Sequence, residues 1–236
     1  MACIIAAPSS SSGKTLLSVI LSAWAKNNQL NLQPFKVGPD YLDSQLLTAV
    51  SQRFCRNLDL ILCKEKWVNE TFYKYGGLAD LTLIEGVMGL FDGIGSTSKG
   101  STADIAKQLQ LPIILTINAQ GQAASLAPLV KGFRDQDPSL EIAGVVLNHV
   151  NTERHKLLLQ EVLNSIDVNF LGSLPTSNEL KLPNRHLGLI PAQEIENLEE
   201  RIGSWQQIAN DNLDISMFRK LLKAPQRIET SIDLTK

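Results

Sequence analysis

The chain has 236 residues, of which 44% are hydrophobic and 19% charged, so it is long enough to bury a large core as one domain. Its 22 basic and 24 acidic residues are mixed along the sequence and give a formal charge of -2, which argues against a nucleic-acid partner. No apolar run approaches the roughly 18 residues that span a bilayer, and residues 1–7 are too short for a secretory signal. We therefore expect a cytoplasmic protein with no membrane partner.

Apolar runs rich in β-branched residues alternate along the chain with segments of helical periodicity. This alternation predicts an α/β fold with a mostly parallel sheet and helices on both of its faces. The predicted strands are residues 2–7, 32–37, 81–85, 112–118, 141–148 and 169–173. The predicted helices are residues 14–26, 102–109, 122–135, 154–165, 196–209 and 213–222. In such a fold, functional residues lie in the loops after the strands.

A serine-rich loop follows the first predicted strand and opens the first predicted helix. From Ala6 to Thr15 it reads AAPSSSSGKT, in the position that a phosphate-binding P-loop requires. We expect its backbone N–H groups to surround a phosphate, Lys14 to reach the β- and γ-phosphates, and the Thr15 hydroxyl to lie on Mg²⁺. Pro8 stands where the strict pattern has its first glycine, so a serine-rich helix cap remains an alternative.

The loop after the second predicted strand reads FKVGPDYLD, from Phe35 to Asp43. A lysine at a strand end, here Lys36, stabilises the negative charge that develops when a phosphoryl group is transferred. Asp40 or Asp43 could complete a Mg²⁺ shell, since that ion prefers oxygen ligands. The alternative is a Gly-Pro-Asp turn followed by a helix that an aspartate caps.

Glu85 ends the third predicted strand and begins the sequence EGVMGLFDG, which contains Asp92. An unpaired carboxylate is costly to bury at the end of an apolar strand, so a metal or a cation is expected beside it. A structural ion pair is the alternative for Glu85. The glycines of this loop permit a close backbone approach to a ligand.

Taken together, several segments resemble the ATP-binding domain of the cobyrinic acid a,c-diamide synthase family. APSSSSGKT, FKVGPDYLD, CRNLDL, IEGVMGLFDG and GSTADIAKQLQLP occur in the order of that family, and GVVLNHV, LGSLP and LPNRHLGLIPA continue the match. The resemblance covers nearly all of residues 2–192 and implies a P-loop fold related to dethiobiotin synthetase. In that family, Mg-ATP phosphorylates the a- and c-acetate side chains of cobyrinic or hydrogenobyrinic acid, a corrin. Ammonia then displaces the phosphate, in a step of cobalamin biosynthesis.

The resemblance also implies roles for individual residues. The triphosphate of ATP is expected to contact Ser9, Ser10, Ser11, Ser12, Gly13, Lys14 and Thr15. Mg²⁺ is expected near Thr15, Asp40 and Glu85, and the γ-phosphate near Lys36. The substrate side would be lined by Tyr41, Leu42, Asp43 and Asp92, and the adenine would meet Asn148 and Pro175. The expected catalytic residues are Lys14, Lys36, Asp40, Asp43, Glu85 and Asp92.

Members of the family also carry a C-terminal glutamine amidotransferase domain that supplies ammonia. None of Cys3, Cys55 and Cys63 lies in the nucleophile-elbow context that such a domain needs. We expect residues 1–225 to form the synthetase domain and residues 226–236 to be a linker or tail that leads to the glutaminase domain. A homodimer is a further expectation, since two-fold dimers are the commonest oligomers.

Two other function classes remain open from the sequence. One is another carboxylate-activating synthetase, such as cobyric acid synthase or dethiobiotin synthetase, although GPDYLD together with CRNLDL favours the diamide enzymes. The other is a nucleotide-dependent switch, which the absence of a second lysine near the start of the P-loop disfavours. The chain departs from the family at three positions: Ser11 replaces a common glycine, Leu47 a usual histidine, and Asn118 a strand-ending aspartate.

Overall fold

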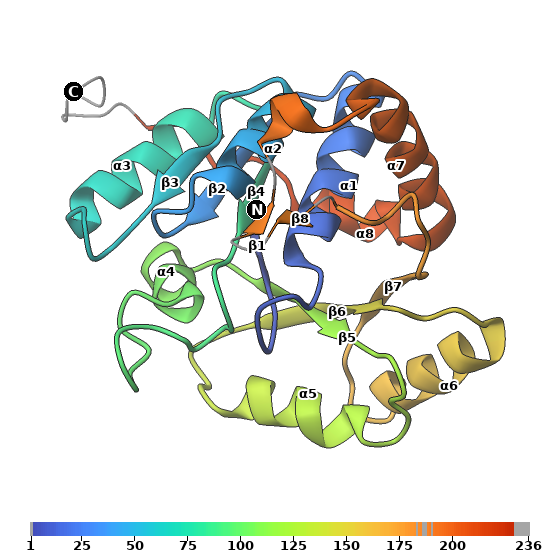
Figure 1. The fold of residues 1–236 in the computed structure, drawn as a ribbon. Helices are drawn as coiled ribbons and strands as arrows, with labels where there is room; N and C mark the ends of the chain where they lie inside the picture. The colour runs from blue at the N-terminus through green and yellow to red at the C-terminus, as the bar shows by residue number, and fades with distance from the viewer. Residues whose placement is uncertain (1, 183, 186–187, 190, 229–236) are drawn as a thin grey trace.

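The computed structural model describes residues 2–182, 184–185, 188–189 and 191–228 of the chain (Figure 1). His186, to which the sequence assigned no catalytic role, lies outside these residues, as do residues 229–236 of the expected tail. A mostly parallel sheet with helices on both faces, the predicted fold class, is confirmed.

Seven strands form one sheet in the order β3-β2-β4-β1-β5-β6-β7, and every neighbouring pair in it is parallel. From β1 the chain crosses outward to β2 and β3, returns to β4, and then builds the other half of the sheet. Ligands bind in α/β sheets at such a reversal of strand order, which here surrounds β1 and β4. The strands are β1 (Cys3–Ala6), β2 (Leu32–Val37), β3 (Arg56–Leu58), β4 (Leu81–Glu85), β5 (Ile113–Asn118), β6 (Ile142–Asn148) and β7 (Phe170–Leu174).

Two helical layers cover the sheet, one on each face (Figure 1). One layer contains α1 (Lys14–Asn27), α2 (Leu42–Ser51), α7 (Leu198–Asn212) and α8 (Ile215–Leu221). The other contains α3 (Glu65–Gly76), α4 (Thr102–Leu109), α5 (Leu126–Asp135) and α6 (Glu153–Asn164). Smaller elements are the two-stranded sheet of β8 (Asn184–Arg185) and β9 (Gly188–Leu189), and the 3-10 helix η1 (Ala192–Glu194).

Side-chain alternation along β1 explains why its sequence is apolar throughout. Cys3 and Ile5 pack into the core on the α1 side, whereas Ile4 and Ala6 pack into the core on the α4 side. A strand buried on both faces has no polar positions, so it reads as a continuous apolar run. This property made the central strands predictable.

The helix predicted at residues 122–135 was wrong at its start, because α5 begins only at Leu126. Pro128 gives the physical reason: it lacks an N–H group and its ring clashes with the preceding turn, so it is tolerated only in the first turn of a helix. The sequence also missed α2, α3 and β3. Of these, β3 has three residues at the edge of the sheet and too little pattern to detect.

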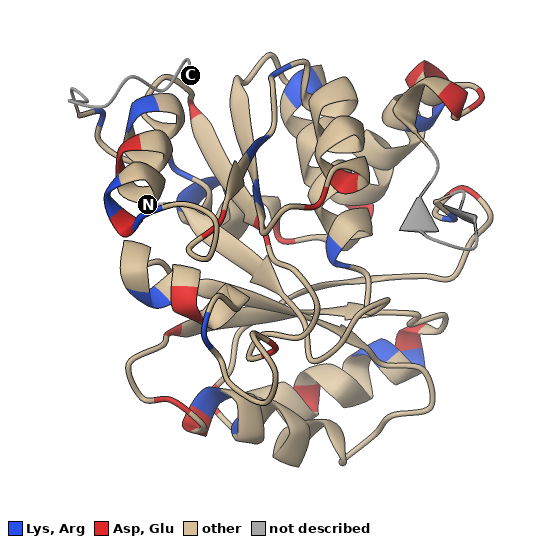
Figure 2. Cartoon of the chain, turned by 60° about the vertical axis from the view of Figure 1, so that its left-hand side comes forward, with Lys and Arg blue, Asp and Glu red and all other residues tan. Residues whose placement is uncertain are grey.

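The last described residues still pack against the domain. Leu222 accepts a hydrogen bond from the backbone of Thr82, and a bridge joins Leu81 with Lys223. Arg227 lies against Gly77 at the end of α3, two residues beyond the predicted domain boundary. Charges of both signs are interspersed over the helices and loops (Figure 2). In the part of the chain that the structure describes, no helix has the length and apolarity to cross a membrane.

Candidate functional site

The loop between β1 and α1 has the backbone of an anion-binding loop. Ser11 adopts a left-handed conformation with φ 60°, and Gly13 has φ 108° immediately before α1 begins at Lys14. The Ser12 hydroxyl donates to the Ser9 carbonyl at 3.0 Å, which closes the loop on itself. The helix N-terminus behind it offers backbone N–H donors and a partial positive charge to an anion.

Lys14 crosses from this loop to the loop after β4. Its Nζ donates to the carbonyl oxygen of Ser9 at 3.3 Å and to that of Met88. Burial, which has the largest effect, and the nearby charge of Lys36 together lower the pKa of Lys14 to about 8, against the opposing effect of the neighbouring carboxylates. Met88 has φ 46°, so its backbone is held in a strained left-handed conformation at this contact.

Sheet register places Lys36 directly opposite Glu85 on the neighbouring strand. The Lys36 Nζ donates to Glu85 Oε1 at 2.8 Å, to Asp43 Oδ2 at 2.6 Å and to the Gly86 carbonyl at 3.1 Å. The Lys36 side chain is only 2% exposed. An ammonium group has three donors, so all three of them are used inside the protein.

Thr15 joins this cluster to the phosphate loop. Its hydroxyl donates to Glu85 Oε1 at 2.6 Å and lies 3.4 Å from Asp43 Oδ2. Thr15, Lys36, Asp43 and Glu85 therefore form one hydrogen-bonded cluster, to which β1, β2 and β4 each lead. We call these four residues the Lys36 cluster.

Asp40 stands one step outside the Lys36 cluster. Its Oδ1 accepts the backbone N–H of Asp43 at 3.1 Å at the start of α2. Burial, and then the charge of Asp43, raise the pKa of Asp40. Burial also raises the pKa of Asp43, but Lys36 outweighs it and the net shift is downward. Of the two candidate aspartates, Asp43 is the one in direct contact with Thr15 and Lys36.

Glu85 is completely buried, and burial raises the pKa of its carboxyl group although Lys36 opposes the shift. Its second oxygen, Oε2, has no hydrogen-bond partner among the described residues. Among the described residues, no group of three or more His, Cys, Asp or Glu side chains could hold a metal ion by itself. Mg²⁺ is usually held by one or two protein groups together with phosphate oxygens and water, so an unpartnered carboxylate oxygen beside a threonine hydroxyl fits this ion.

The expected substrate-side residues outside the Lys36 cluster are Tyr41, Leu42 and Asp92, and they differ in exposure. Tyr41 is 72% exposed and Leu42 is half-buried at the beginning of α2. Asp92 is exposed, and its Oδ2 accepts the Gly89 N–H at 2.7 Å. This contact ties Asp92 to the loop whose Met88 carbonyl holds Lys14.

The expected adenine residues lie at the end of β6 and directly after β7. Asn148 is buried, with its Nδ2 3.4 Å from the Ser12 carbonyl and its Oδ1 accepting the His149 N–H at 3.0 Å. Pro175 directly follows β7 and is half-buried. Asn148 therefore lies against the phosphate loop.

Two positioning residues were missed by the sequence analysis. Asn57 Nδ2 donates to the carbonyl oxygens of Gly38 and Asp40 at 2.7 and 2.9 Å, and so fixes the loop that leads to Asp43. The Thr102 hydroxyl accepts from the Val87 N–H and donates to its carbonyl, at 2.9 and 3.1 Å. Both lie in the segments CRNLDL and GSTADIAKQLQLP, so the only available signal was that these segments accompany the acidic loops.

The three departures from the family pattern fall in different surroundings. Leu47 is completely buried in the hydrophobic core on the α1 side of the sheet. Asn118 is exposed, and its Oδ1 accepts the Gln120 N–H at 3.0 Å. Ser11 occupies a left-handed backbone position, which explains why a glycine suits it.

Comparison with known proteins agrees with this geometry. Residues 3–190 match the family of the CobQ/CobB/MinD/ParA nucleotide binding domain. The chain is 42% identical over 229 residues to a cobyrinate a,c-diamide synthase of Caldanaerobacter subterraneus subsp. tengcongensis, covering 96% of this chain and 50% of that protein. It is 43% identical over 192 residues to a hydrogenobyrinate a,c-diamide synthase of Streptomyces coelicolor, covering 81% of this chain and 40% of that protein. The chain thus spans about half the length of the curated relatives it matches.

Among solved structures, the chloroplast FtsY of Physcomitrella patens is similar with a TM-score of 0.53 at 9% identity, covering 87% of this chain and 65% of that one. At this identity the similarity concerns the fold alone.

Proposed function

Since the chain belongs to the family of CobQ/CobB/MinD/ParA nucleotide-binding domains, we propose that it is the ATP-dependent synthetase part of a cobyrinate or hydrogenobyrinate a,c-diamide synthase. It would amidate the a- and c-acetate carboxylates of the corrin through acyl phosphates, in cobalamin biosynthesis. The ammonia would come from a glutaminase domain. The names of relatives at 42% and 43% identity support this proposal over another carboxylate-activating synthetase.

The observation that carries the proposal is the Lys36 cluster. It joins Thr15 of the phosphate loop to Asp43 of the substrate-side helix through a buried cation and Glu85. A nucleotide-dependent switch needs a phosphate loop, but it has no need for a buried lysine on β2 that pairs with two carboxylates next to that loop. An enzyme that transfers a phosphoryl group to a carboxylate needs charges of both signs at that position.

The reaction requires an activated carboxylate because hydroxide is a poor leaving group. A carboxylate oxygen attacks the γ-phosphorus of ATP, the bond to the β-phosphate oxygen breaks, and ADP leaves. Ammonia then adds through its lone pair to the acyl carbon, the C–O bond to phosphate breaks, and one proton is lost. The protein has mainly to orient the reactants and to neutralise charge.

Thr15 and Glu85 are the residues that would hold Mg²⁺, with Asp43 or Asp40 next to them. When bound, Mg²⁺ would neutralise charge on the β- and γ-phosphates. Lys14 would do the same from the phosphate loop, after exchanging the Met88 carbonyl for phosphate oxygens. Its lowered pKa makes this exchange favourable, since the phosphates restore the charged form that burial disfavours.

Lys36 would reach the γ-phosphate by exchanging one of its three protein acceptors. Asp43 is the partner best placed to leave, because its side chain is 15% exposed whereas that of Glu85 is fully buried. Release of Asp43 would free its carboxylate to meet the substrate side together with Tyr41, Leu42 and Asp92. In this way Lys36 would couple binding of the nucleotide to release of the Asp43 carboxylate toward the substrate.

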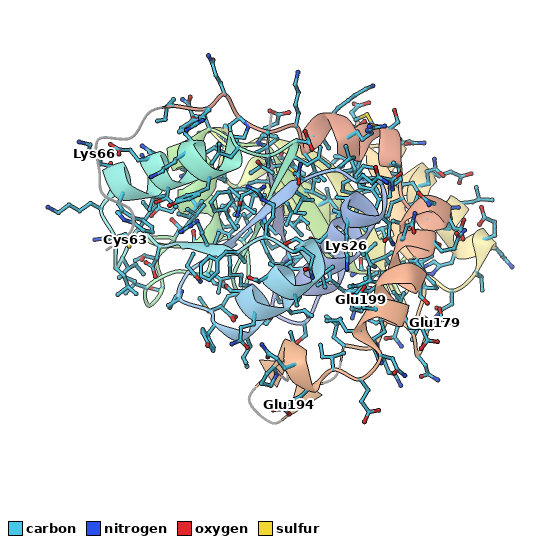
Figure 3. All side chains as sticks on the ribbon, turned by 90° about the horizontal axis from the view of Figure 1, so that it is seen from above. Lys26, Cys63, Lys66, Glu179, Glu194 and Glu199 are labelled. Atoms are coloured by element: carbon cyan, nitrogen blue, oxygen red, sulfur yellow. The ribbon has the colours of Figure 1, made fainter. Side chains whose placement is uncertain are left out.

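An assay of ammonia-dependent amidation of cobyrinic acid tests this function. The assay measures the ADP and the diamide that form. We expect Glu85→Gln to lower the rate about 100-fold or more, because a buried group next to the transferred phosphate is lost. Glu199→Gln is the matched control, since Glu199 pairs with Lys26 on the surface between α1 and α7 (Figure 3). We expect Asp43→Asn to raise KM for the corrin more than Kd for the nucleotide.

Two results would contradict the proposal, and a third would change the role of one residue. Binding of a non-hydrolysable ATP analogue without binding of cobyrinic or hydrogenobyrinic acid would leave a nucleotide-binding protein of another class. Turnover of diaminopelargonic acid instead of the corrin would point to dethiobiotin synthetase chemistry. Wild-type amidation by Glu85→Gln would remove Glu85 from the metal position.

A further inference from the structure

A cavity of about 360 Å³ lies at the β3 edge of the sheet, between the loop after β2 and the beginning of α3. Its wall includes Pro39 from the loop that leads to Asp43, Arg56 and Asn57 from β3, and Trp67 from α3. None of the residues expected to bind ATP lines it. The cavity is therefore separate from the phosphate loop but shares a wall with the substrate side.

Arg56 is the chemically distinctive group of this wall. Its guanidinium carbon lies 3.4 Å from the ring centroid of Tyr75 and 5.4 Å from that of Phe54. Within the described ranges of the chain, no carboxylate pairs with this guanidinium and no hydrogen bond uses its N–H groups. Stacking on aromatic rings fixes the planar group, which leaves donors in the fork geometry that matches a carboxylate.

Asn57 connects this cavity to the Lys36 cluster. It follows Arg56 in β3 and pairs in register with Lys36 of β2. Its side chain holds the carbonyl oxygens of Gly38 and Asp40, which flank the Pro39 of the cavity wall. A molecule reacting beside Asp43 could thus extend along Pro39 into the cavity.

Asp59 and Cys63, the other titratable groups of the wall, do not pair with Arg56. Asp59 is buried, and its Oδ1 accepts the backbone N–H groups of Ile61 and Leu62 at 2.7 and 2.9 Å. Burial, and then Asp59, raise the pKa of the Cys63 thiol above its ordinary value of 9.0, so this group is uncharged at pH 7. Cys63 marks this side of the molecule in Figure 3, away from the Lys26 and Glu199 pair.

Two exposed apolar side chains also line the cavity. Phe54 is 68% exposed and Leu62 is 73% exposed, and both line the cavity. Large apolar groups at such exposure beside a free guanidinium fit a ligand with an apolar body and an anionic edge.

We propose that Arg56 binds a second carboxylate of the substrate, one that is not being amidated, while the apolar body lies against Phe54 and Leu62. This inference rests on the proposed function and narrows it to substrates with several carboxylates. Arg56 would be a binding residue rather than a catalytic residue, because it lies outside the Lys36 cluster. Its loss would therefore raise KM and leave kcat nearly unchanged.

Arg56→Gln tests the inference by steady-state kinetics with cobyrinic acid and by calorimetry with cobyrinic acid and with benzenehexacarboxylate, a flat polyanion. We expect a 10- to 100-fold rise in KM and Kd for both ligands, as is typical for loss of a hydrogen bond to a charged group. We expect Arg56→Lys to recover part of this loss, since it keeps the charge without the fork. Lys74→Gln is the control, because it removes the same charge 5.4 Å from the Tyr75 ring without lining the cavity.

The outcomes separate this inference from the proposed function. If the wild type amidates cobyrinic acid and Arg56→Gln does so with unchanged KM, the carboxylate position is wrong and the function stands. If the wild type fails to use cobyrinic acid but binds benzenehexacarboxylate through Arg56, the position stands and the function is wrong. Equal weakening by Lys74→Gln would show only a general effect of charge, and it would overturn the assignment to Arg56. Unfolding midpoints within about 2 °C of the wild type show that the variants fold.

Discussion

Replacing Lys36 by methionine tests the central ion pair network most directly. The change keeps the length of the buried side chain but removes three hydrogen bonds, two of them to carboxylates at 2.6 and 2.8 Å. Hydrogen bonds to charged groups each stabilise by about 1.5–3 kcal/mol, and removing one partner of a buried ion pair costs about 3–5 kcal/mol. We therefore expect Lys36→Met to lower the free energy of unfolding by about 3–5 kcal/mol at pH 8.

The loss should depend on pH, and its sign follows from the carboxyl groups. Burial lowers the pKa of Lys36, but Glu85 and Asp43 outweigh this and raise it, so Lys36 stays charged between pH 5 and 8 and its own titration adds no pH dependence there. In the variant, the pKa of Glu85 rises further above its ordinary value of 4.5 because its cation is gone. A raised carboxyl pKa destabilises the folded state above the ordinary value, so the variant should lose more stability at pH 8 than at pH 5.

Urea and thermal unfolding at pH 5 and pH 8 measure this difference. For a chain of this length, the expected loss at pH 8 corresponds to a Tm lower by about 6–20 °C. Lys26→Met is the control, because Lys26 pairs with Glu199 at the surface and such pairs contribute about 0–1 kcal/mol. A loss below about 1 kcal/mol for Lys36→Met, or an equal loss at both pH values, would refute the reasoning.

Three further predictions concern the loops of the site. Ser11→Gly should stabilise the chain by about 0.5–1 kcal/mol in thermal unfolding, since glycine adopts φ 60° without strain; a lower Tm would contradict this. At pH 8.5, binding of a non-hydrolysable ATP analogue should take up about three-quarters of a proton, because a pKa of about 8 leaves Lys14 mostly unprotonated there and the phosphates raise this pKa. Calorimetry in buffers of different ionisation enthalpy measures this uptake, which should vanish at pH 6.5. Gly86→Ala should destabilise by about 1–3 kcal/mol, as a Cβ there would lie 2.9 Å from the Ile5 carbonyl, whereas Gly132→Ala in α5, with open space around it, should not.

The sequence predicted the central part of the fold because burial on both faces leaves a simple pattern. Lys36 and Glu85 each end an apolar run, and parallel strands bring such ends to one edge of the sheet. The register that sets these two residues opposite each other could not be predicted, since it depends on β2 and β4 being neighbours although they are not consecutive. The sequence therefore indicated the edge of the sheet but not the ion pair.

The choice between Asp40 and Asp43 could not be made from the sequence for a similar reason. The two aspartates are three residues apart, and either could cap a helix or face a metal. The start of α2 at Leu42 decides between them, because it places the Asp43 N–H within reach of the Asp40 carboxylate and turns the Asp43 side chain toward Lys36. Such a start depends on one helical turn, which is within the usual uncertainty of a predicted helix end.

The position of Arg56 could not be predicted from the sequence for a different reason. Nothing in the letters CRNLDL shows that a guanidinium stacks on Tyr75 of α3, since α3 itself was not predicted. The phosphate loop and Glu85 belong to the central strands β1 and β4, where register and burial allow little movement. Asp43, by contrast, belongs to α2, and Arg56 belongs to the edge strand β3. Asn57 of β3 donates a hydrogen bond to the Asp40 carbonyl just before α2 and so connects the two elements. In the proposed function, nucleotide binding would rest on residues at the ends of the central strands, and the choice of substrate on residues at the β3 edge of the sheet.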